Sequence, residues 1–269
     1  MNDPTFADRG RAGARRSRTS VLDPARYAVY LITDNPSRYD GDFVEAVERA
    51  IAGGVTLVQY RDKESDGRRL YERCLRLQDM LRARDVPLVV NNLPGLALAV
   101  GAAAVHVGQD DLPPEAVRRA VGPGLDIGWS VRNAAEAAAV DPSLVDAVGI
   151  GPVYDARGTK ADAADALGLD GLRAAVLALP PGLASVAIGG VTVERAPGLF
   201  AQGVDGVSVV SAFSRAPDPA AVAPPSPRAA PERRHPPQSR SSPLRQDSHF
   251  RTRFASIARN PPAHLGPCP

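Results

Sequence analysis

Residues 55–63, Val-Thr-Leu-Val-Gln-Tyr-Arg-Asp-Lys, hold the pattern that decides the fold: a short apolar run that ends directly in charged residues. Such runs, when rich in Val, Ile and Leu, are typical of parallel strands buried on both faces. The same pattern recurs along the chain. The eight expected strands cover residues 27–32, 55–60, 87–90, 103–107, 125–129, 146–150, 183–188 and 206–210.

The segments between these runs carry helical periodicity. Leu70, Cys74, Leu77 and Leu81 recur at spacings of three and four residues, which places them on one face of a helix. Eight alternations of strand and helix predict an α/β protein, a (β/α)8 barrel of the TIM type. A doubly wound open sheet is the competing architecture, but it uses fewer strands, and no G-x-G-x-x-G turn follows the first run here.

The two ends of the chain differ from this body. Residues 1–26 are polar and arginine-rich, so we expect a disordered extension; a transit peptide fits less well because Asp3 and Asp8 interrupt it. Residues 27–215 form the expected barrel domain. From Pro217 onward lie 13 of the 26 prolines, so residues 216–269 are expected to be a disordered tail. Pro224 and Pro225 would leave the last helix truncated or replaced, through either a reading-frame change or a lineage-specific extension.

Composition excludes several classes of function. The net charge of +2 gives no case for a nucleic-acid partner. Cys74 falls on an apolar helix face and Cys268 in the tail, which predicts no disulfide and fits a reducing cytoplasm. No apolar run reaches the ~20 residues of a membrane span. We therefore expect a soluble, cytoplasmic protein, and the sequence predicts no oligomeric state.

Lys63 and Lys160 are the only lysines among 32 basic residues, and each follows an expected strand. A compact ammonium suits a phosphate, whereas biased codon usage would explain the count but not the positions. Gln59, Arg61 and Lys63 share one face if their strand continues, and two cations beside an amide indicate an anion site. Arg61 could instead pair with Asp62 or Glu64.

Reactive groups of a (β/α)8 barrel lie at the carboxyl ends of its strands, and the loops after strands seven and eight usually bind phosphate. Polar or glycine residues stand at these places: Asn91, Asn92, Gly108 to Asp111, Ser130, Thr159, Lys160, Gly189, Gly190 and Ser211. Three structural alternatives stay open. Asn91 and Asn92 could form a turn, His106 lies in an apolar run as a core histidine would, and Tyr60 and Tyr154 are expected to pack.

These motifs resemble, in the same order, those of the thiamine phosphate synthase family, and the resemblance covers residues 27–213. The matching segments are Gln59 to Lys63, Asn91, Gly108 to Asp111, Ser130, Gly151 to Tyr154, Thr159-Lys160, Ile188 to Val191 and Val209 to Ala212. The resemblance implies a transferase of thiamine biosynthesis. It would condense 4-amino-2-methyl-5-(diphosphooxymethyl)pyrimidine with a thiazole phosphate, giving thiamine phosphate and pyrophosphate.

The resemblance also implies roles for individual residues. The pyrimidine diphosphate would be held by Gln59, Tyr60, Arg61, Asp62, Lys63, Asn91, Ser130 and Lys160. Among these, the implied catalytic residues are Arg61, Lys63, Ser130 and Lys160. The thiazole phosphate would be held by Thr159, Gly190, Val210 and Ser211, and the cofactor Mg²⁺ by Asp111 and the residue at position 92.

Two departures from the family pattern stand out. Position 92 is asparagine where the family has aspartate, which removes one negative charge from the metal site. The loop at residues 155–158 is one residue longer than usual, which puts the exact contact with the thiazole phosphate in question. The alternatives for function are a thiazole tautomerase-like isomerase of the same fold and a non-catalytic barrel that binds thiamine phosphate.

Overall fold

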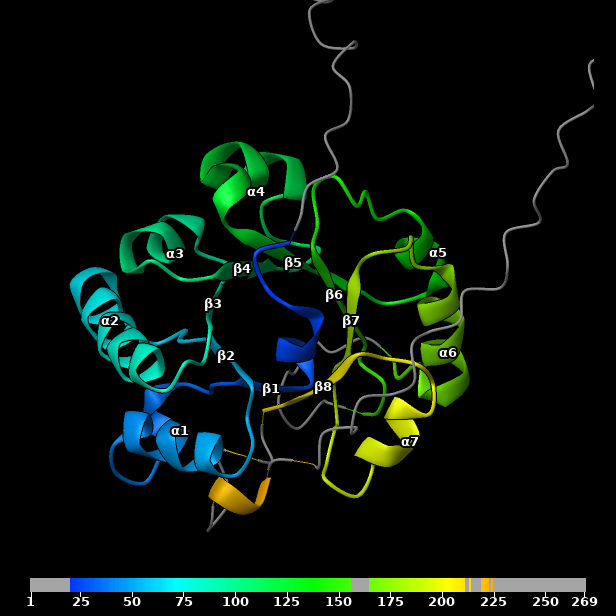
Figure 1. The fold of residues 1–269 in the computed structure, drawn as a ribbon. Helices are drawn as coiled ribbons and strands as arrows, with labels where there is room; N and C mark the ends of the chain where they lie inside the picture. The colour runs from blue at the N-terminus through cyan, green and yellow to red at the C-terminus, as the bar shows by residue number, and fades with distance from the viewer. Residues whose placement is uncertain (1–19, 156–164, 211–212, 214–218, 223, 225–269) are drawn as a thin grey trace, which may run out of the picture. The chain divides into compact units, whose positions relative to one another are not determined.

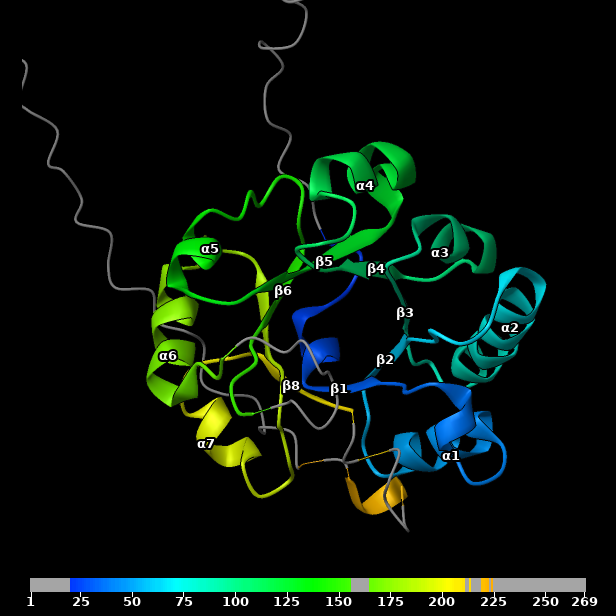
Figure 2. The same ribbon diagram turned by 180° about the vertical axis from the view of Figure 1, so that it is seen from behind.

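The computed structural model describes residues 20–155, 165–210, 213, 219–222 and 224. Eight parallel strands close into one barrel in sequence order, as Figures 1 and 2 show from its two ends. They are β1 (Val29–Ile32), β2 (Leu57–Tyr60), β3 (Leu88–Asn91), β4 (Ala104–Val107), β5 (Asp126–Val131), β6 (Ala147–Ile150), β7 (Ala184–Ala187) and β8 (Gly206–Val209). Val29 of β1 pairs with Val207 of β8, which closes the ring. The predicted barrel is confirmed, and the open sheet is wrong.

Helices cover the outside of the barrel (Figure 1). They are α1 (Phe43–Ala52), α2 (Gly67–Ala83), α3 (Pro94–Val100), α4 (Pro114–Val121), α5 (Ala134–Ala138), α6 (Gly168–Ala178) and α7 (Ala196–Phe200). The predicted face of α2 is buried at Cys74, Leu77 and Leu81. Short 3-10 helices add η1 (Pro24–Tyr27), η2 (Pro36–Arg38), η3 (Gly122–Gly124) and η4 (Pro219–Val222). Within the described ranges, no helix is both long and apolar enough to cross a bilayer.

Strand alternation divides the core into two parts. Val58 and Tyr60 of β2 belong to the layer between barrel and helices, whereas Leu57 of the same strand belongs to a smaller cluster inside the barrel. That inner cluster is filled by Leu22, Tyr27, Tyr30, Leu57, Val89, Ala104, Ala147, Ala184 and Val186. Because apolar groups occupy the inside of the barrel, the polar groups of a site gather where the strands end.

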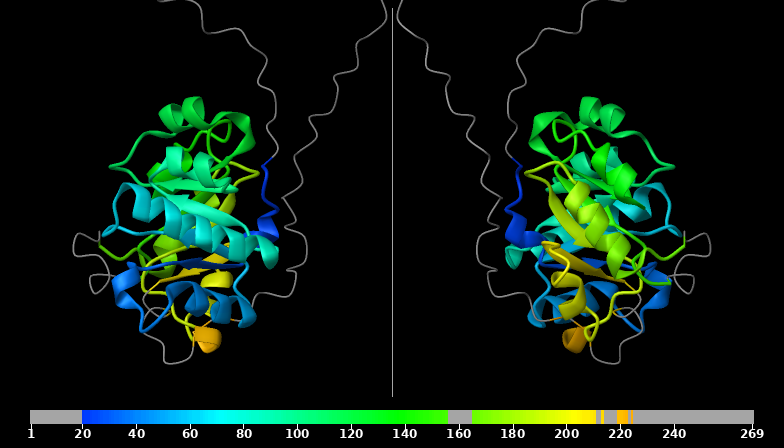
Figure 3. Two further views of the ribbon diagram at one scale, coloured as in Figure 1. Left: turned by 90° about the vertical axis from the view of Figure 1, so that its left-hand side faces the viewer. Right: turned by 90° about the vertical axis from the view of Figure 1, so that its right-hand side faces the viewer.

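The segment before β1 is part of the barrel. The Ser20 hydroxyl and the Leu22 N–H donate to Asp126 Oδ2 at 2.6 and 2.9 Å, and the Val21 N–H donates to Oδ1 at 2.8 Å. Leu22 is buried, and η1 lies in the middle of the ring in Figure 1 and at one end of the barrel in Figure 3. The expected disorder up to residue 26 was therefore wrong for residues 20–26, because Asp126 holds the backbone of Val21 and Leu22 and η1 begins at Pro24. Residues 1–19 lie outside the described residues.

Two described pieces follow β8. Phe213 is buried, with its ring centroid 5.8 Å from that of Tyr39. The 3-10 helix η4 lies against α1, where the Ala220 carbonyl occupies the space that a side chain on Gly53 would need. A short 3-10 helix thus stands beside α1, and a glycine makes room for it. Most of the predicted tail lies outside the described residues.

Candidate functional site

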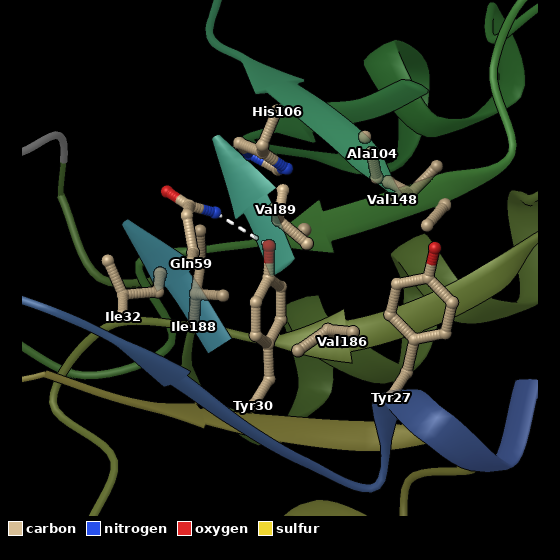
Figure 4. A pocket seen from close by; sticks show the side chains of 13 residues that line it. Tyr27, Tyr30, Ile32, Gln59, Val89, Ala104, His106, Val148, Val186 and Ile188 are labelled. Atoms are coloured by element: carbon tan, nitrogen blue, oxygen red, sulfur yellow. Dashed lines mark hydrogen bonds between the residues drawn. The ribbon is translucent and has the colours of Figure 1, made fainter. Parts of the chain in front are cut away.

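Gln59 and Tyr30 form the floor of the site at the carboxyl end of the barrel. Gln59 is 1% exposed, and its Nε2 donates to the Tyr30 hydroxyl at 2.7 Å (Figure 4). Burial raises the pKa of Tyr30 well above its ordinary value, so the phenol stays protonated. The cavity beside this pair has a volume of about 20 Å³, which holds about one water molecule. The cavity is therefore too small to hold an aromatic ring, and space for a larger ligand exists only at the mouth of the barrel.

His106 projects from β4 into the same cavity (Figure 4). Its Nε2 lies 2.9 Å from the Ser130 hydroxyl on β5. Gly128 and Gly149 leave the space that the ring fills, since a side chain at either would contact the imidazole. Burial lowers the pKa of His106 to about 4, so the ring is neutral near pH 7. His106 is thus a satisfied core histidine, and it also orients Ser130, a predicted substrate contact.

The loop after β1 holds the loop after β2 in place. The Arg61 N–H donates to the Thr33 hydroxyl at 2.9 Å, and the Lys63 N–H donates to Asn35 Oδ1 at 2.9 Å. The Arg61 guanidinium lies 3.9 Å from the buried Asp34 carboxylate, and its side chain is 21% exposed. Arg61 therefore pairs with Asp34 rather than with Asp62 or Glu64, the partners that the sequence suggested.

Tyr60 and Asp62 have structural side chains. Asp62 Oδ2 accepts from the Tyr60 hydroxyl at 2.9 Å, and Oδ1 accepts from the N–H groups of Glu64 and Ser65, both at 2.9 Å. Tyr60 packs in the layer between barrel and helices, as expected. That Tyr60 and Asp62 help to hold the diphosphate stays a prediction, and with these side chains bonded to their own loop it would rest on their backbone groups.

Side chains with amide and carboxylate oxygens come together after β3 and β4. Asn92 has a left-handed backbone with φ of 59°, a conformation that asparagine tolerates. Its side chain accepts from Asn91 Nδ2 at 2.8 Å and donates to Asp111 Oδ1 at 2.7 Å. Asp111 Oδ2 accepts from the Gly108 N–H at 2.7 Å. The two residues predicted to bind metal are therefore in direct contact, although no group of three or more His, Cys, Asp or Glu side chains forms a metal cluster among the described residues.

Backbone groups dominate the opposite side of the mouth. Gly189 and Gly190 follow β7 with φ of 89° and 65°. The N–H groups of Val153 and Tyr154 donate to the carbonyls of Ile188 and Gly189 at 2.9 and 3.1 Å. Within the described ranges, the N–H groups of Gly190 and Val191 donate no hydrogen bond. They are thus available to an anion, as the position after strand seven predicts.

Several predicted residues cannot be placed. Thr159, Lys160 and Ser211 lie outside the described residues, as do residues 156–158 of the lengthened loop. The expectation that Lys63 and Lys160 face one pocket stays a prediction for the same reason. Val210 is described and follows β8 directly, where it is partly buried.

Sequence reasoning missed the residues that orient the site. Thr33, Asp34 and Asn35 had no assigned role, although they follow the first strand directly, which is the signal that identified the other loops. Gln109 was noted only as part of a motif, and its Nε2 donates to the Ser130 carbonyl at 2.6 Å.

The comparisons with known proteins agree with this geometry. The family model of thiamine monophosphate synthase matches residues 29–213, which span the whole barrel. The chain belongs to the thiamine monophosphate synthase family. The thiamine-phosphate synthase of Azorhizobium caulinodans is 44% identical over 195 residues, which cover 72% of this chain and 91% of that protein. The corresponding protein of Chloroflexus aurantiacus is 41% identical over 76% of this chain and 93% of its own length.

One solved structure supports the family membership, and a second shows the fold alone. Thiamine phosphate pyrophosphorylase from Pyrococcus furiosus superposes with a TM-score of 0.67 at 33% identity, covering 74% of this chain and 93% of that one. A 3-hexulose-6-phosphate synthase superposes with a TM-score of 0.50 at 17% identity, over 72% of this chain and 95% of that one, which shows a shared fold alone. The predicted resemblance to thiamine phosphate synthases is confirmed.

Proposed function

We propose that this chain is the transferase that condenses 4-amino-2-methyl-5-(diphosphooxymethyl)pyrimidine with a thiazole phosphate, forming thiamine phosphate and releasing pyrophosphate. The main support for this proposal is the match to the family model across residues 29–213. Relatives named thiamine-phosphate synthases at about 40% identity support this condensation in thiamine biosynthesis. They support neither the isomerase nor the non-catalytic barrel that the sequence left open.

The diphosphate side of the site is proposed at the ends of β2, β3 and β5. Arg61 and Lys63 supply two positive charges, and the loop after β1 fixes their backbone. Gln59, Asn91 and Ser130 offer polar groups around the space above the Gln59–Tyr30 floor. Lys160 would complete this set from the loop after β6. Because the cavity below Gln59 holds only about one water, the pyrimidine ring lies on this floor rather than beneath it.

The reaction needs stabilisation of a leaving polyanion. The bond between the pyrimidine methylene carbon and the diphosphate oxygen breaks, and both electrons leave with pyrophosphate. The thiazole nitrogen then donates its lone pair to the methylene carbon. Fixed cations aimed at the departing oxygens lower the barrier to this step, and no serine or cysteine nucleophile is required. Arg61 and Lys63 serve this role in the proposal, together with Lys160.

A Mg²⁺ ion fits the residues after β3 and β4. Mg²⁺ takes oxygen ligands, keeps several waters, and is commonly held by one or two carboxylates together with substrate phosphates. Asp111 offers a carboxylate and Asn92 an amide oxygen, and the two side chains already touch at 2.7 Å. The ion would neutralise charge on the diphosphate as it leaves. Binding it requires Asp111 Oδ1 to exchange the Asn92 N–H for the metal.

The thiazole phosphate is proposed to bind at the loops after β7 and β8. The N–H groups of Gly190 and Val191 face no acceptor among the described residues, and Val210 stands at the end of β8. Thr159 and Ser211 would add hydroxyl groups. Backbone N–H groups of such a loop are suited to a phosphate because they approach it closely without a side chain between.

One assay separates the three functions. Purified protein is incubated with the pyrimidine diphosphate, the thiazole phosphate and Mg²⁺, and pyrophosphate and thiamine phosphate are measured. The proposal predicts both products in equal amounts. Isomerisation of the thiazole without pyrophosphate would support the isomerase, and binding without any product would support the non-catalytic barrel.

A further inference from the structure

Arg195 connects two loops of the barrel mouth from a position immediately before α7. Its Nη1 donates to the Gly190 carbonyl at 2.6 Å. Its guanidinium carbon lies 4.3 Å from the centroid of the Tyr154 ring, which is the geometry of a cation–π contact. Gly190 follows β7 and Tyr154 follows β6, so one exposed side chain holds both loops.

The contact of Arg195 with the Gly190 carbonyl sets the direction of the next backbone donor, the Val191 N–H. A peptide unit is planar and trans, so its carbonyl and the following N–H point in opposite directions. By holding the Gly190 oxygen, Arg195 fixes the direction of the Val191 N–H, which donates to no described residue. The two glycines with positive φ make the peptide units at this turn easy to rotate. A contact that selects one orientation therefore has a defined effect.

Tyr154 supplies the second half of the contact. A side chain at Gly190 would come within 2.7 Å of Tyr154 Cβ, so the two loops pack closely. The Tyr154 N–H also donates to the Gly189 carbonyl at 3.1 Å. The ring therefore offers Arg195 a fixed surface, which keeps the guanidinium on the carbonyl although the side chain is exposed.

We infer that Arg195 is a positioning residue for the thiazole-phosphate site, and that it acts by orienting the Gly190–Val191 peptide. This inference rests on the proposed function of that loop. Arg195 acts through the backbone donor, with Tyr154 as its support. Loss of the side chain should weaken binding of the thiazole phosphate and leave the pyrimidine diphosphate site intact, because Arg61 and Lys63 belong to another side of the mouth.

The test uses Arg195→Ala in the full-length protein, with Arg173→Ala as a matched control. Arg173 is an exposed arginine of α6 and lies away from the β7 loop in sequence. Calorimetry should show that Arg195→Ala raises the dissociation constant for the thiazole phosphate by about 10- to 100-fold. This corresponds to the free energy of one hydrogen bond to a charged group. The KM for the pyrimidine diphosphate should change by less than about twofold, and Arg173→Ala should leave both values unchanged.

Tyr154 variants test the mechanism. Tyr154→Phe keeps the ring and should behave as the unmodified protein, whereas Tyr154→Leu should weaken thiazole phosphate binding as Arg195→Ala does. Unchanged thiazole phosphate affinity in Arg195→Ala would overturn the inference, as would equal losses for both substrates. The binding measurement does not depend on turnover. An unmodified protein that binds the thiazole phosphate but releases no pyrophosphate would contradict the proposed function and leave the inference testable.

Discussion

Replacing Asn92 by aspartate changes the charge of the proposed Mg²⁺ site with little change in shape. In the present structure the Asn92 amide donates to Asp111 Oδ1 at 2.7 Å. An aspartate would set two carboxylates at that distance, and their repulsion would be relieved by a cation. One unit charge acting at about 4 Å is worth about 4 kcal/mol at an effective dielectric constant of about 20. The substitution also removes the hydrogen bond from Asn92 to the Asp111 carboxylate, worth about 1.5 to 3 kcal/mol, so that the metal no longer competes with it for Asp111 Oδ1.

Dehydration of Mg²⁺ and solvent screening offset part of this gain. We expect a net change of about 1.4 to 2.8 kcal/mol, which lowers the Mg²⁺ concentration for half-maximal activity by about 10- to 100-fold. Turnover at saturating Mg²⁺ should change little, because the diphosphate still supplies most ligands. The assay is pyrophosphate release across a Mg²⁺ titration. A suitable control is Asn133→Asp, which adds the same charge at the exposed residue before α5. The reasoning is refuted if Asn92→Asp leaves the metal dependence unchanged.

Three further predictions address Asp111, His106 and the tail. Asp111→Ala should reduce turnover at least about 100-fold at every Mg²⁺ concentration, since it removes the carboxylate of the proposed site; full activity would contradict that site. The pKa of His106 is lowered to about 4 in the fold against an ordinary 6.5, so its contribution to stability is complete above pH 6.5 and is lost as the pH falls through about 4. Between pH 7 and pH 4, urea unfolding should show that the free energy of unfolding falls by up to roughly 3 kcal/mol more in the unmodified protein than in His106→Gln; equal decreases would contradict the lowered pKa of His106. Deleting residues 224–269 should leave turnover unchanged and shift the melting temperature by less than about 4 °C, whereas unfolding of the barrel would show that the tail replaces the eighth helix.

The fold could be predicted because each strand has a recognisable local sequence pattern. Short Val-, Ile- and Leu-rich runs that end in polar residues place all eight strands within a few residues of their observed bounds. Errors occurred where a contact from a distant segment decides the structure. Residues 20–26 look like a polar extension, but Asp126, more than 100 positions away, accepts hydrogen bonds from their backbone.

The candidate site was predictable at the level of strand ends and not at the level of side-chain direction. The position of Asn92 beside Asp111 follows from neighbouring strands, and the structure places them in contact. The role of Asp62 does not follow, because a carboxylate after a strand can turn outward to a ligand or inward to its own loop, and three local donors decide the second case here. The need for glycine at positions 128 and 149 could not be predicted, because it depends on the His106 ring that lies beside them in the fold.

The most direct test of the account is the stoichiometry of the reaction with both purified substrates and Mg²⁺, followed by the same measurement on Lys63→Ala. The account predicts one pyrophosphate released for each thiamine phosphate formed, and a turnover at least about 10-fold lower in the variant, because a cation at the leaving group is lost. Pyrophosphate release without thiamine phosphate, or no product from the unmodified protein, would contradict it.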